Sequence, residues 1–210
     1  QMFHIVPHPK NDVGNANHRI HSTRALRTDQ CLGPGFYNDI IIPISTKPQD
    51  CNYNFGKEKN ISKNNLLYAC GNEHKWSKLY KGLRSGIPAA FNLLNKTDID
   101  MRADGRSPKE YDEGFWKSKF CFVIPGDTTS TSQSSRAMCA GCVPIFIVSD
   151  FRDLPFSNIL DYSKFSIRYY SSEFATQNEN RDLNRAIEVY GYLQEMVLNG
   201  TYLELMRNVE

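Results

Sequence analysis

One continuous stretch, Lys119 to Ser166, restricts the fold of this chain more than any other. It begins with the short apolar run Phe120–Ile124, whose length and composition are typical of a buried strand. A polar loop follows, and Ser134–Ala140 is expected to form a short helix that ends at Gly141. Val143–Val148 is a second apolar strand. This order of strand, loop, helix and strand predicts a right-handed crossover in a parallel sheet.

The loop between that strand and helix is rich in small hydroxyl side chains, from Thr128 to Ser132. The first backbone N–H groups of a helix lack partners and carry partial positive charge. A loop of this kind, at the carboxyl end of a parallel strand, is suited to bind a phosphate group. The alternative is that the hydroxyl groups only cap the helix and keep the loop soluble.

A series of short motifs runs through the same stretch and aligns without gaps. In order, they are Phe120-Cys121, Pro125, Gly126-Asp127-Thr128, Gly141-Cys142-Val143-Pro144, Ser149-Asp150, Leu154-Pro155-Phe156 and Leu160-Asp161-Tyr162. A single tripeptide would carry little information, but the ordered set is specific. It resembles the C-terminal domain of the exostosin-type family of inverting glycosyltransferases. Weaker similarity to the same family is found in Phe3–His8, Tyr37–Pro43 and Leu66–Gly71.

The resemblance implies an α/β fold of the GT-B-like kind, with a Rossmann-type parallel sheet and helices on both faces. We expect residues 1–44 to be the remnant of an N-terminal, acceptor-side α/β domain, because they supply fewer strands than a complete nucleotide-binding domain needs. Residues 45–65 are polar and are predicted to form a linker or exposed loop. Residues 66–210 are predicted to form the C-terminal nucleotide-sugar-binding domain, with a first domain that is reduced or truncated.

Within these domains, apolar periodicity and capping residues predict the individual elements. Besides Ser134–Ala140, five segments are expected to be helical: Thr23–Asp29, Trp76–Leu94 with an interruption at Gly86-Ile87-Pro88, Ser107–Lys117, Arg181–Leu198 and Tyr202–Val209. Ser107, Pro108 and Glu110 have the spacing of a capping box. Strands are predicted at Phe3–Val6, Asp39–Ile44, Leu66–Cys70, Thr97–Met101 and Phe165–Tyr169, besides the two already named.

Bulk composition excludes some classes of protein. The formal net charge of +2 does not indicate a nucleic-acid partner, and no apolar run approaches the ~20 residues of a membrane helix.

The family resemblance implies that any membrane anchor lies outside this chain, and that the protein works in the Golgi or another part of the secretory lumen. A cytoplasmic protein is the alternative. Three Asn-x-Ser/Thr sequons, at Asn60, Asn95 and Asn199, do not decide the compartment, because so many are expected by chance.

The inverting glycosyl transfer that the family resemblance implies needs a base, a cradle for the leaving nucleoside diphosphate and a pocket for the sugar. His8, followed by Asp12, is the candidate base, because both lie in the loop after the first strand. The candidate donor-binding residues are Arg84, Gly126, Asp127, Thr128, Ser130, Thr131, Ser132, Gln133, Arg136 and Asp150. We expect no cofactor and no metal, with a UDP- or GDP-linked sugar as donor and a glycan or glycoprotein as acceptor. Asp98-Ile99-Asp100 fits the letters of a metal-binding D-x-D motif but has the pattern of a strand.

Two positions depart from the family's pattern, which usually has an arginine and then an acidic residue where this chain has Gln133 and Arg136. In the family the arginine is expected to bind the donor's phosphates and the acidic residue its ribose. An arginine cannot accept a hydrogen bond from a ribose hydroxyl. Either the donor is held differently, with Arg136 taking over the phosphates, or the protein is a weak or inactive member that binds a nucleotide sugar or partners an active transferase.

The cysteines leave a further alternative open. Cys139 and Cys142 form a single C-x-x-C, for which we favour packing in the core over a redox role. A redox or hydrolytic α/β enzyme built on these two thiols is the remaining hypothesis, and disulfides in a secretory lumen stay open.

Overall fold

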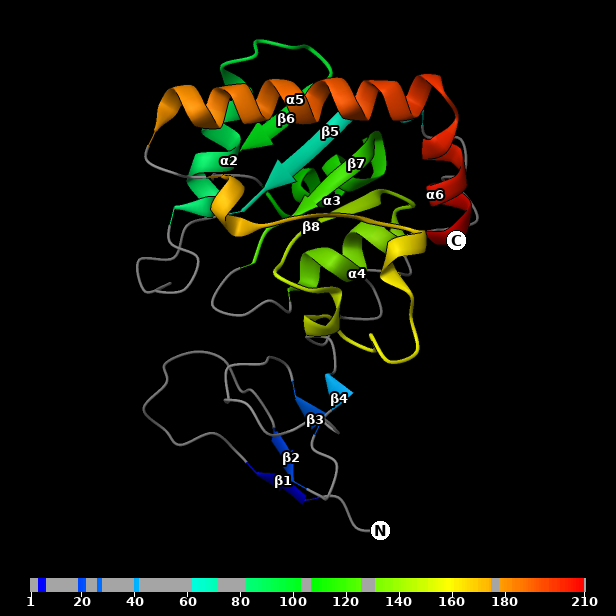
Figure 1. Ribbon diagram of the computed structural model, residues 1–210. Coiled ribbons are helices and arrows are strands. Elements are labelled where there is room, and N and C mark those ends of the chain that lie inside the picture. Colours follow the sequence, from blue (N-terminus) through cyan, green and yellow to red (C-terminus); the bar gives the residue numbers. More distant parts are fainter. Residues whose placement is uncertain are drawn as a thin grey trace.

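The structure is a computed structural model of the chain. It describes residues 62–71, 82–102, 107–125, 131–174 and 178–209, together with the backbone of residues 4–6, 19–21, 26–27 and 40–41. Figure 1 shows the described elements as coloured ribbons.

The centre of the fold is a parallel sheet in the order β6-β5-β7-β8-β9. Its strands are β5 (Asn65–Cys70), β6 (Ile99–Arg102), β7 (Ser118–Val123), β8 (Val143–Ile147) and β9 (Ile167–Tyr169). The chain therefore begins inside the sheet, moves to one edge with β6, and returns past β5 to continue with β7. The direction of winding reverses between β5 and β7, and in such sheets this is where ligands bind, beyond the carboxyl ends of the strands.

Helices cover both faces of this sheet, as predicted. They are α2 (Leu83–Asn92), α3 (Pro108–Lys117), α4 (Ser132–Cys139), α5 (Glu179–Leu198) and α6 (Thr201–Val209), with short 3-10 helices at Phe151–Asp153, Tyr162–Lys164 and Ser171–Glu173. In Figure 1, α5 lies along the upper side of the sheet and α6 turns away from its end. The predicted capping box is present at α3, where Ser107 accepts a hydrogen bond from the Glu110 N–H and the Glu110 carboxylate accepts one from the Ser107 N–H.

Strand alternation divides the core into two layers. Phe120 and Phe122 of β7 face α2 and α5, whereas Cys121 and Val123 face α3 and α4. Every residue of β8 is buried, as expected of a central strand covered on both sides. On the α3 side, Gly114 lets the helix approach the ring of Tyr68 so closely that an added Cβ would lie 2.1 Å from it.

The predicted interruption of α2 is wrong. The helix continues through Gly86 and Pro88, although an internal proline costs about 3 kcal/mol. Ile87 and Phe91 are fully buried against the sheet. Burying each such side chain stabilises by about 1.5–3 kcal/mol, so packing outweighs the local preference.

A second sheet contains β1 (His4–Val6), β2 (Arg19–His21), β3 (Leu26–Arg27) and β4 (Ile40–Ile41), in that order. β1 and β4 lie within the strands predicted for these regions. The helix predicted at Thr23–Asp29 is wrong, since Leu26–Arg27 is a strand that pairs antiparallel with β2 and parallel with β4. Backbone pairing with two neighbours overrides a weak helical pattern in so short a segment.

A disulfide joins Cys121 in β7 to Cys142, which directly precedes β8. Cys139 is also disulfide-bonded. Cys142 is packed in the core, as predicted, but it is disulfide-bonded rather than a free thiol. A redox site in which Cys139 and Cys142 act as a pair is wrong, because Cys142 is bonded to Cys121. The spacing of the cysteines could not reveal this pairing, which depends on the register that places Phe120 opposite Val143.

The amino edge of the sheet is fastened by Lys63. Its ammonium group donates hydrogen bonds to the carbonyl oxygens of Ser118 at 2.9 Å, Ala140 at 3.0 Å and Trp116 at 3.3 Å. Burial, and then the positive charge of Lys119, lowers the pKa of Lys63 to about 8. None of the helices in the described part of the chain is both long and apolar enough to cross a lipid bilayer.

Candidate functional site

The described residues include six of the predicted site residues: Arg84, Thr131, Ser132, Gln133, Arg136 and Asp150. The predicted base residues His8 and Asp12, and the loop residues Gly126, Asp127, Thr128 and Ser130, lie outside the described part of the chain. All six described residues belong to elements that begin or end at the carboxyl edge of the sheet, which is where the sequence places a donor site.

Gln133 joins the two strands between which the winding reverses. Its side-chain oxygen accepts a hydrogen bond of 2.9 Å from the N–H of Ile124, directly after β7. Its side-chain nitrogen donates one of 2.5 Å to the carbonyl oxygen of Cys70, the last residue of β5. The side chain is buried, so these bonds form away from water. Gln133 therefore fixes the spacing of β5 and β7 where a ligand would enter.

Arg84 lies in the first turn of α2 and reaches the same place from the other face of the sheet. Its guanidinium group donates to the carbonyl oxygens of Pro125, at 3.2 Å, and Ile124, at 3.4 Å. Gly71, the residue after β5, lies between Arg84 and Gln133. An added Cβ at Gly71 would be 3.3 Å from the Gln133 nitrogen and 3.6 Å from Arg84 Cδ. A positive charge is thus held at the ends of β5 and β7.

The N-terminus of α4 faces the same edge. Thr131 is its N-cap, and the Thr131 hydroxyl accepts a hydrogen bond from the Gln133 N–H at 3.3 Å. Ser134 donates from its hydroxyl to the carbonyl oxygen of Thr131 at 2.6 Å. The Thr131 hydroxyl of the loop therefore caps α4, as the alternative interpretation of the loop expected. The positive end of the α4 dipole still points towards the carboxyl edge.

Arg136 lies one turn further along α4 and is held by two residues of α3 that sequence reasoning missed. Its guanidinium group forms an ion pair with the carboxylate of Asp112. The same group lies over the ring of Tyr111, 5.2 Å from its centre. Burial raises the pKa of Tyr111. No motif marks Asp112 or Tyr111; their position one turn from the capped start of α3 is the only signal in the sequence.

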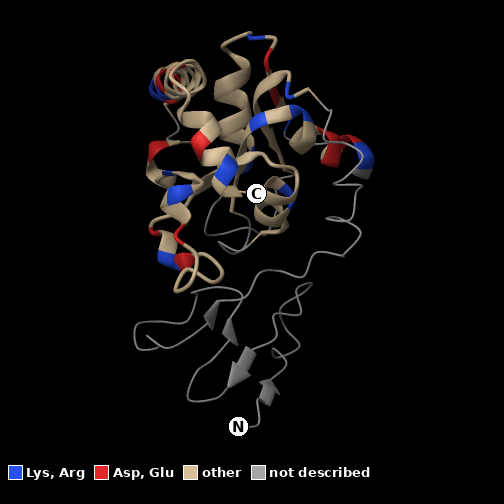
Figure 2. Ribbon diagram, turned by 90° about the vertical axis from the view of Figure 1, so that its right-hand side faces the viewer, with Lys and Arg blue, Asp and Glu red and all other residues tan. Residues whose placement is uncertain are grey.

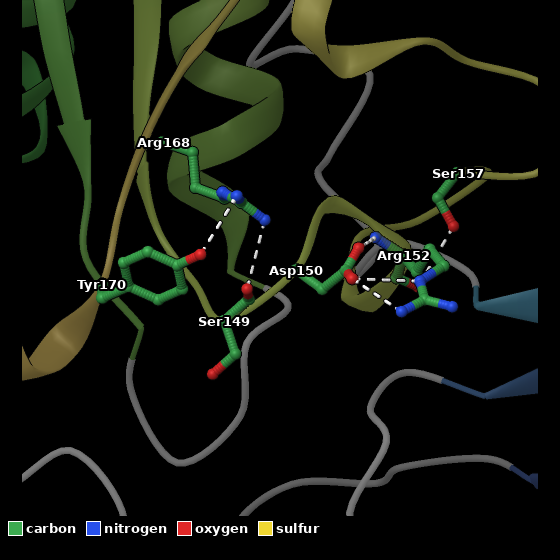
Figure 3. Close-up of polar contacts among 6 residues, drawn as sticks. All are labelled: Ser149, Asp150, Arg152, Ser157, Arg168 and Tyr170. Atoms are coloured by element: carbon green, nitrogen blue, oxygen red, sulfur yellow. Dashed lines mark hydrogen bonds and ion pairs between the residues drawn. The ribbon is translucent and has the colours of Figure 1, made fainter.

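Asp150 lies beyond the end of β8, in the cluster shown in Figure 3. Its carboxylate accepts hydrogen bonds from the backbone N–H of Arg152 at 2.8 Å and from the Arg152 guanidinium group at 2.8 and 3.0 Å. These bonds lower the pKa of Asp150. Asp150 also caps the 3-10 helix that follows it. Its carboxylate is therefore ionised, and its present hydrogen bonds are made within this turn.

Next to Asp150, Arg168 of β9 lies between two aromatic rings. Its guanidinium carbon is 5.4 Å from the centre of the Phe151 ring and 5.1 Å from that of Tyr170. It donates to the carbonyl oxygen of Ser149 at 3.2 Å and to the Tyr170 hydroxyl at 3.3 Å, as Figure 3 shows. Arg168 is a further cation at the carboxyl edge, and sequence reasoning did not select it.

The site residues thus form two groups on one edge of the sheet. Arg84, Gln133 and Arg136 surround the ends of β5 and β7, and Asp150 and Arg168 lie at the ends of β8 and β9. Along the described elements, Lys and Arg residues are interspersed with Asp and Glu residues (Figure 2). The D-x-D-like residues are elsewhere: Asp98 precedes β6 at the amino edge and accepts a hydrogen bond from Tyr190 at 3.1 Å.

The chain is similar in sequence to several known proteins. The probable arabinosyltransferase ARAD1 of Arabidopsis thaliana is 33% identical over 159 residues, which are 74% of this chain and 33% of that protein. The probable glycosyltransferase At3g07620 of Arabidopsis thaliana is 28% identical over 51% of this chain and 21% of its own length. Exostosin-2 of Bos taurus is 31% identical over 40% of this chain and 10% of its own length.

The chain matches at most a third of the length of these relatives. Its own residues 4–180 match the exostosin GT47 domain. The match covers most of the chain and includes both groups of site residues. It also agrees with the parallel α/β sheet that the motifs predicted. The chain therefore belongs to the exostosin GT47 domain family.

Proposed function

We propose that this chain binds a nucleotide-sugar donor, UDP- or GDP-linked, at the carboxyl edge of its five-stranded sheet and serves in a metal-independent, inverting glycosyl transfer. One observation carries the proposal: Arg84, the N-terminus of α4 and the Gln133 bridge meet at the ends of β5 and β7. Parallel sheets bind nucleotides at such a point, because helix N-termini and loop N–H groups face the phosphates there.

The chemistry requires stabilisation of the leaving nucleoside diphosphate. As the acceptor oxygen bonds to the anomeric carbon, the bond from that carbon to the diphosphate oxygen breaks and the electron pair leaves with the phosphate. Arg84 and the α4 dipole supply fixed positive charge for this oxygen. Arg136, oriented by Asp112 and Tyr111, is a further cation one turn along α4. A cradle of this composition takes the role that a metal ion has in other transferases.

The acceptor, a glycan or glycoprotein, loses its hydroxyl proton to a base, for which His8 and then Asp12 remain the sequence-based proposals. Attack from the face opposite the leaving group inverts the anomeric centre. Asp150 and Arg168 lie at the ends of β8 and β9, which are one and two strands from β7, about 5–10 Å at ~4.8 Å per strand. A nucleotide sugar is long enough to reach from the Gln133 bridge to both, and we assign them to contacts with sugar hydroxyls. The name of ARAD1 favours a pentose as the transferred sugar, with a hexose as the alternative.

The disulfide between Cys121 and Cys142, and the disulfide-bonded state of Cys139, support a secretory compartment such as the Golgi, because the cytosol keeps thiols reduced. A cytoplasmic protein would be expected to lack these bonds. The division into an acceptor-side remnant, a linker and a donor-binding domain at residues 66–210 remains part of the proposal.

A thermal-shift titration with UDP, GDP, CMP and their sugars, with and without EDTA, tests the donor site. We expect one nucleotide family to raise Tm by a few degrees, unchanged by EDTA. Arg84→Ala should abolish the shift, whereas Arg181→Ala, an exposed arginine on α5, should leave it intact. Each variant is compared with its own ligand-free Tm, so a loss of stability is not mistaken for a loss of binding. Absence of a shift with every nucleotide would overturn the proposed donor site.

A second candidate is a family member that is catalytically weak, or that only binds a nucleotide sugar or partners an active transferase. The observation that favours it is the engagement of Gln133 with two backbone groups and of Arg136 with Asp112, at the two positions that depart from the family's pattern. Sugar release separates the candidates. Nucleotide binding without release of the sugar, in the presence of a glycan acceptor mixture, would favour the second.

A further inference from the structure

Two of the three sequons lie within the described part of the chain, and both occupy exposed turns. Asn95-Lys96-Thr97 connects α2 to β6, and Asn199-Gly200-Thr201 connects α5 to α6. Both asparagine side chains are exposed. In each sequon the third residue is threonine. Asn60, the third sequon asparagine, lies outside the described residues.

The local backbone at each site is compatible with a modified asparagine. Asn95 adopts the left-handed region with a φ of 49°, which asparagine tolerates better than most residues. At Asn199 the side-chain oxygen accepts a hydrogen bond of 3.0 Å from the Thr201 N–H, at the start of α6. An N-linked sugar replaces only a hydrogen on the side-chain nitrogen. The oxygen would keep its lone pairs and continue to accept this hydrogen bond at the start of α6.

The surroundings also suit a glycan. Among the described residues, two of the three most exposed large hydrophobic side chains are Leu198, 87% exposed, and Leu93, 62% exposed. Leu198 directly precedes Asn199, and Leu93 is two residues before Asn95. Exposed apolar side chains of this kind favour association between molecules. A hydrophilic glycan on the neighbouring asparagine would cover each of them.

Neither turn lies at the proposed donor site. Asn95 shortly precedes β6, so it lies at the amino edge of the parallel sheet. Tyr202 lies three residues after Asn199, and the centre of its ring is 5.3 Å from the centre of the Phe120 ring, near the start of β7. Arg84, Gln133 and Asp150 lie at the opposite, carboxyl edge. Glycans at both asparagines would therefore leave the carboxyl edge open to a nucleotide sugar.

We propose that Asn95 and Asn199 are N-glycosylation sites, modified from a lipid-linked oligosaccharide diphosphate in the secretory pathway. In the transfer, the asparagine nitrogen bonds to C1 of the first sugar and gives up one proton. The bond from C1 to the lipid diphosphate breaks, and the diphosphate leaves with the electron pair. The disulfide between Cys121 and Cys142 supports an oxidising compartment, such as the secretory pathway, where this donor is available.

The test expresses the full chain behind a cleavable secretory leader in a eukaryotic host, in an Asn60→Gln background and with an added C-terminal Asn-Gly-Thr reporter. Peptide N-glycosidase F removes N-linked glycans and converts each modified asparagine to aspartate. Digestion in water labelled with heavy oxygen marks these conversions apart from spontaneous deamidation at Asn-Gly, and peptide mass spectrometry locates them. We expect conversion at residues 95 and 199 as well as at the reporter. Asn95→Gln and Thr97→Ala should each remove one glycan, as should Asn199→Gln and Thr201→Ala. Asn184→Gln, an exposed asparagine outside any sequon, should remove none.

A glycosylated reporter with no conversion at residues 95 and 199 would overturn the proposal, because the chain would then have met the modifying enzyme without being modified. Donor binding is not needed for this readout. Occupied sequons in a protein that binds no nucleotide would support the inference and contradict the proposed function, so the two are tested separately.

Discussion

The side-chain nitrogen of Gln133 lies 2.5 Å from the carbonyl oxygen of Cys70, and through this bond α4 is tied to the end of β5. The side-chain oxygen binds the Ile124 N–H at the end of β7. One side chain thus spans the point of the sheet at which the proposed donor binds. Gln133 occupies the position at which the family is expected to have a phosphate-binding arginine, but its side-chain hydrogen bonds are directed into the protein.

Replacing Gln133 should therefore affect stability first. Gln133→Ala leaves a buried N–H and a buried carbonyl without this partner, at about 1–3 kcal/mol each. Gln133→Glu keeps the acceptor for Ile124 but places a carboxylate against the Cys70 oxygen. The loss of stability in Gln133→Glu should become smaller as the pH falls, because the new carboxyl group gains a proton that it can donate to the Cys70 oxygen. Urea unfolding at several pH values measures both effects.

Gln194→Ala is the matched control, because Gln194 lies on the exposed side of α5 and donates to the Tyr190 hydroxyl. We expect it to cost less than about 1 kcal/mol. If Gln133→Ala were no more destabilising than Gln194→Ala, the bridge between β5 and β7 would not stabilise the fold.

The Gln133 bridge illustrates the limit of sequence reasoning for this protein. Motif order placed Gln133 at the start of a helix after a strand, which is correct. Its role depends on which backbone groups at the ends of β5 and β7 lack partners, and those groups are 63 and 9 residues away in the chain. Asp112 was missed for the same reason, since its contact with Arg136 forms only when α3 and α4 pack side by side.

Predictions from short sequence segments were correct where the structure depends on neighbouring residues. The capping box at Ser107 and Glu110 fixed the start of α3, and Gly141, with a φ of +59°, follows the end of α4. Such predictions were wrong where contacts with residues distant in the chain determine the secondary structure. Pro88 is held within α2 by burial of the residues around it, and Leu26–Arg27 becomes a strand through pairing with β2 and β4.

Replacement by alanine should lower the stability of the fold at Gly114 and raise it at Gly191. At Gly114 the new methyl group would lie 2.1–2.7 Å from the ring atoms of Tyr68, which is fully buried and bonded through its hydroxyl to the Tyr111 carbonyl. We expect Gly114→Ala to destabilise by about 1–3 kcal/mol. At Gly191, within α5, no heavy atom beyond the adjoining residues and backbone of the helix itself lies within 4 Å of the added Cβ. Gly191→Ala should stabilise by about 0.5–1 kcal/mol. Chemical denaturation of both variants checks the pair, and equal effects would contradict the close packing of α3 on Tyr68.

The ion pair between Arg136 and Asp112 should stabilise more than the pair between Arg152 and Asp150. The first has side chains that are 19% and 27% exposed, the second 84% and 36%. A double-mutant cycle with alanine at both positions should give a coupling of about 1.5–3 kcal/mol for Arg136 and Asp112, nearly unchanged by salt. The same cycle for Arg152 and Asp150 should give under about 1 kcal/mol, falling as salt is added. Equal couplings would show that burial on α3 and α4 does not strengthen the first pair.

Lys63 should make stability depend on pH above neutrality. Its pKa is about 8 in the folded chain and 10.5 as its ordinary value, so between these pH values the unfolded chain binds more protons than the folded one. Stability from this group must then rise with pH across that window, and stay constant below it, where both states are protonated. From pH 7 to 9.5 the rise is about 2 kcal/mol, at 1.36 kcal/mol per pH unit. The free energy of unfolding of the wild type minus that of Lys63→Met should therefore increase by about this amount between pH 7 and 9.5. Titrations shared by both proteins cancel in the difference. A difference that is flat over this range would mean that the three carbonyl oxygens around the ammonium group hold its proton as firmly as water does.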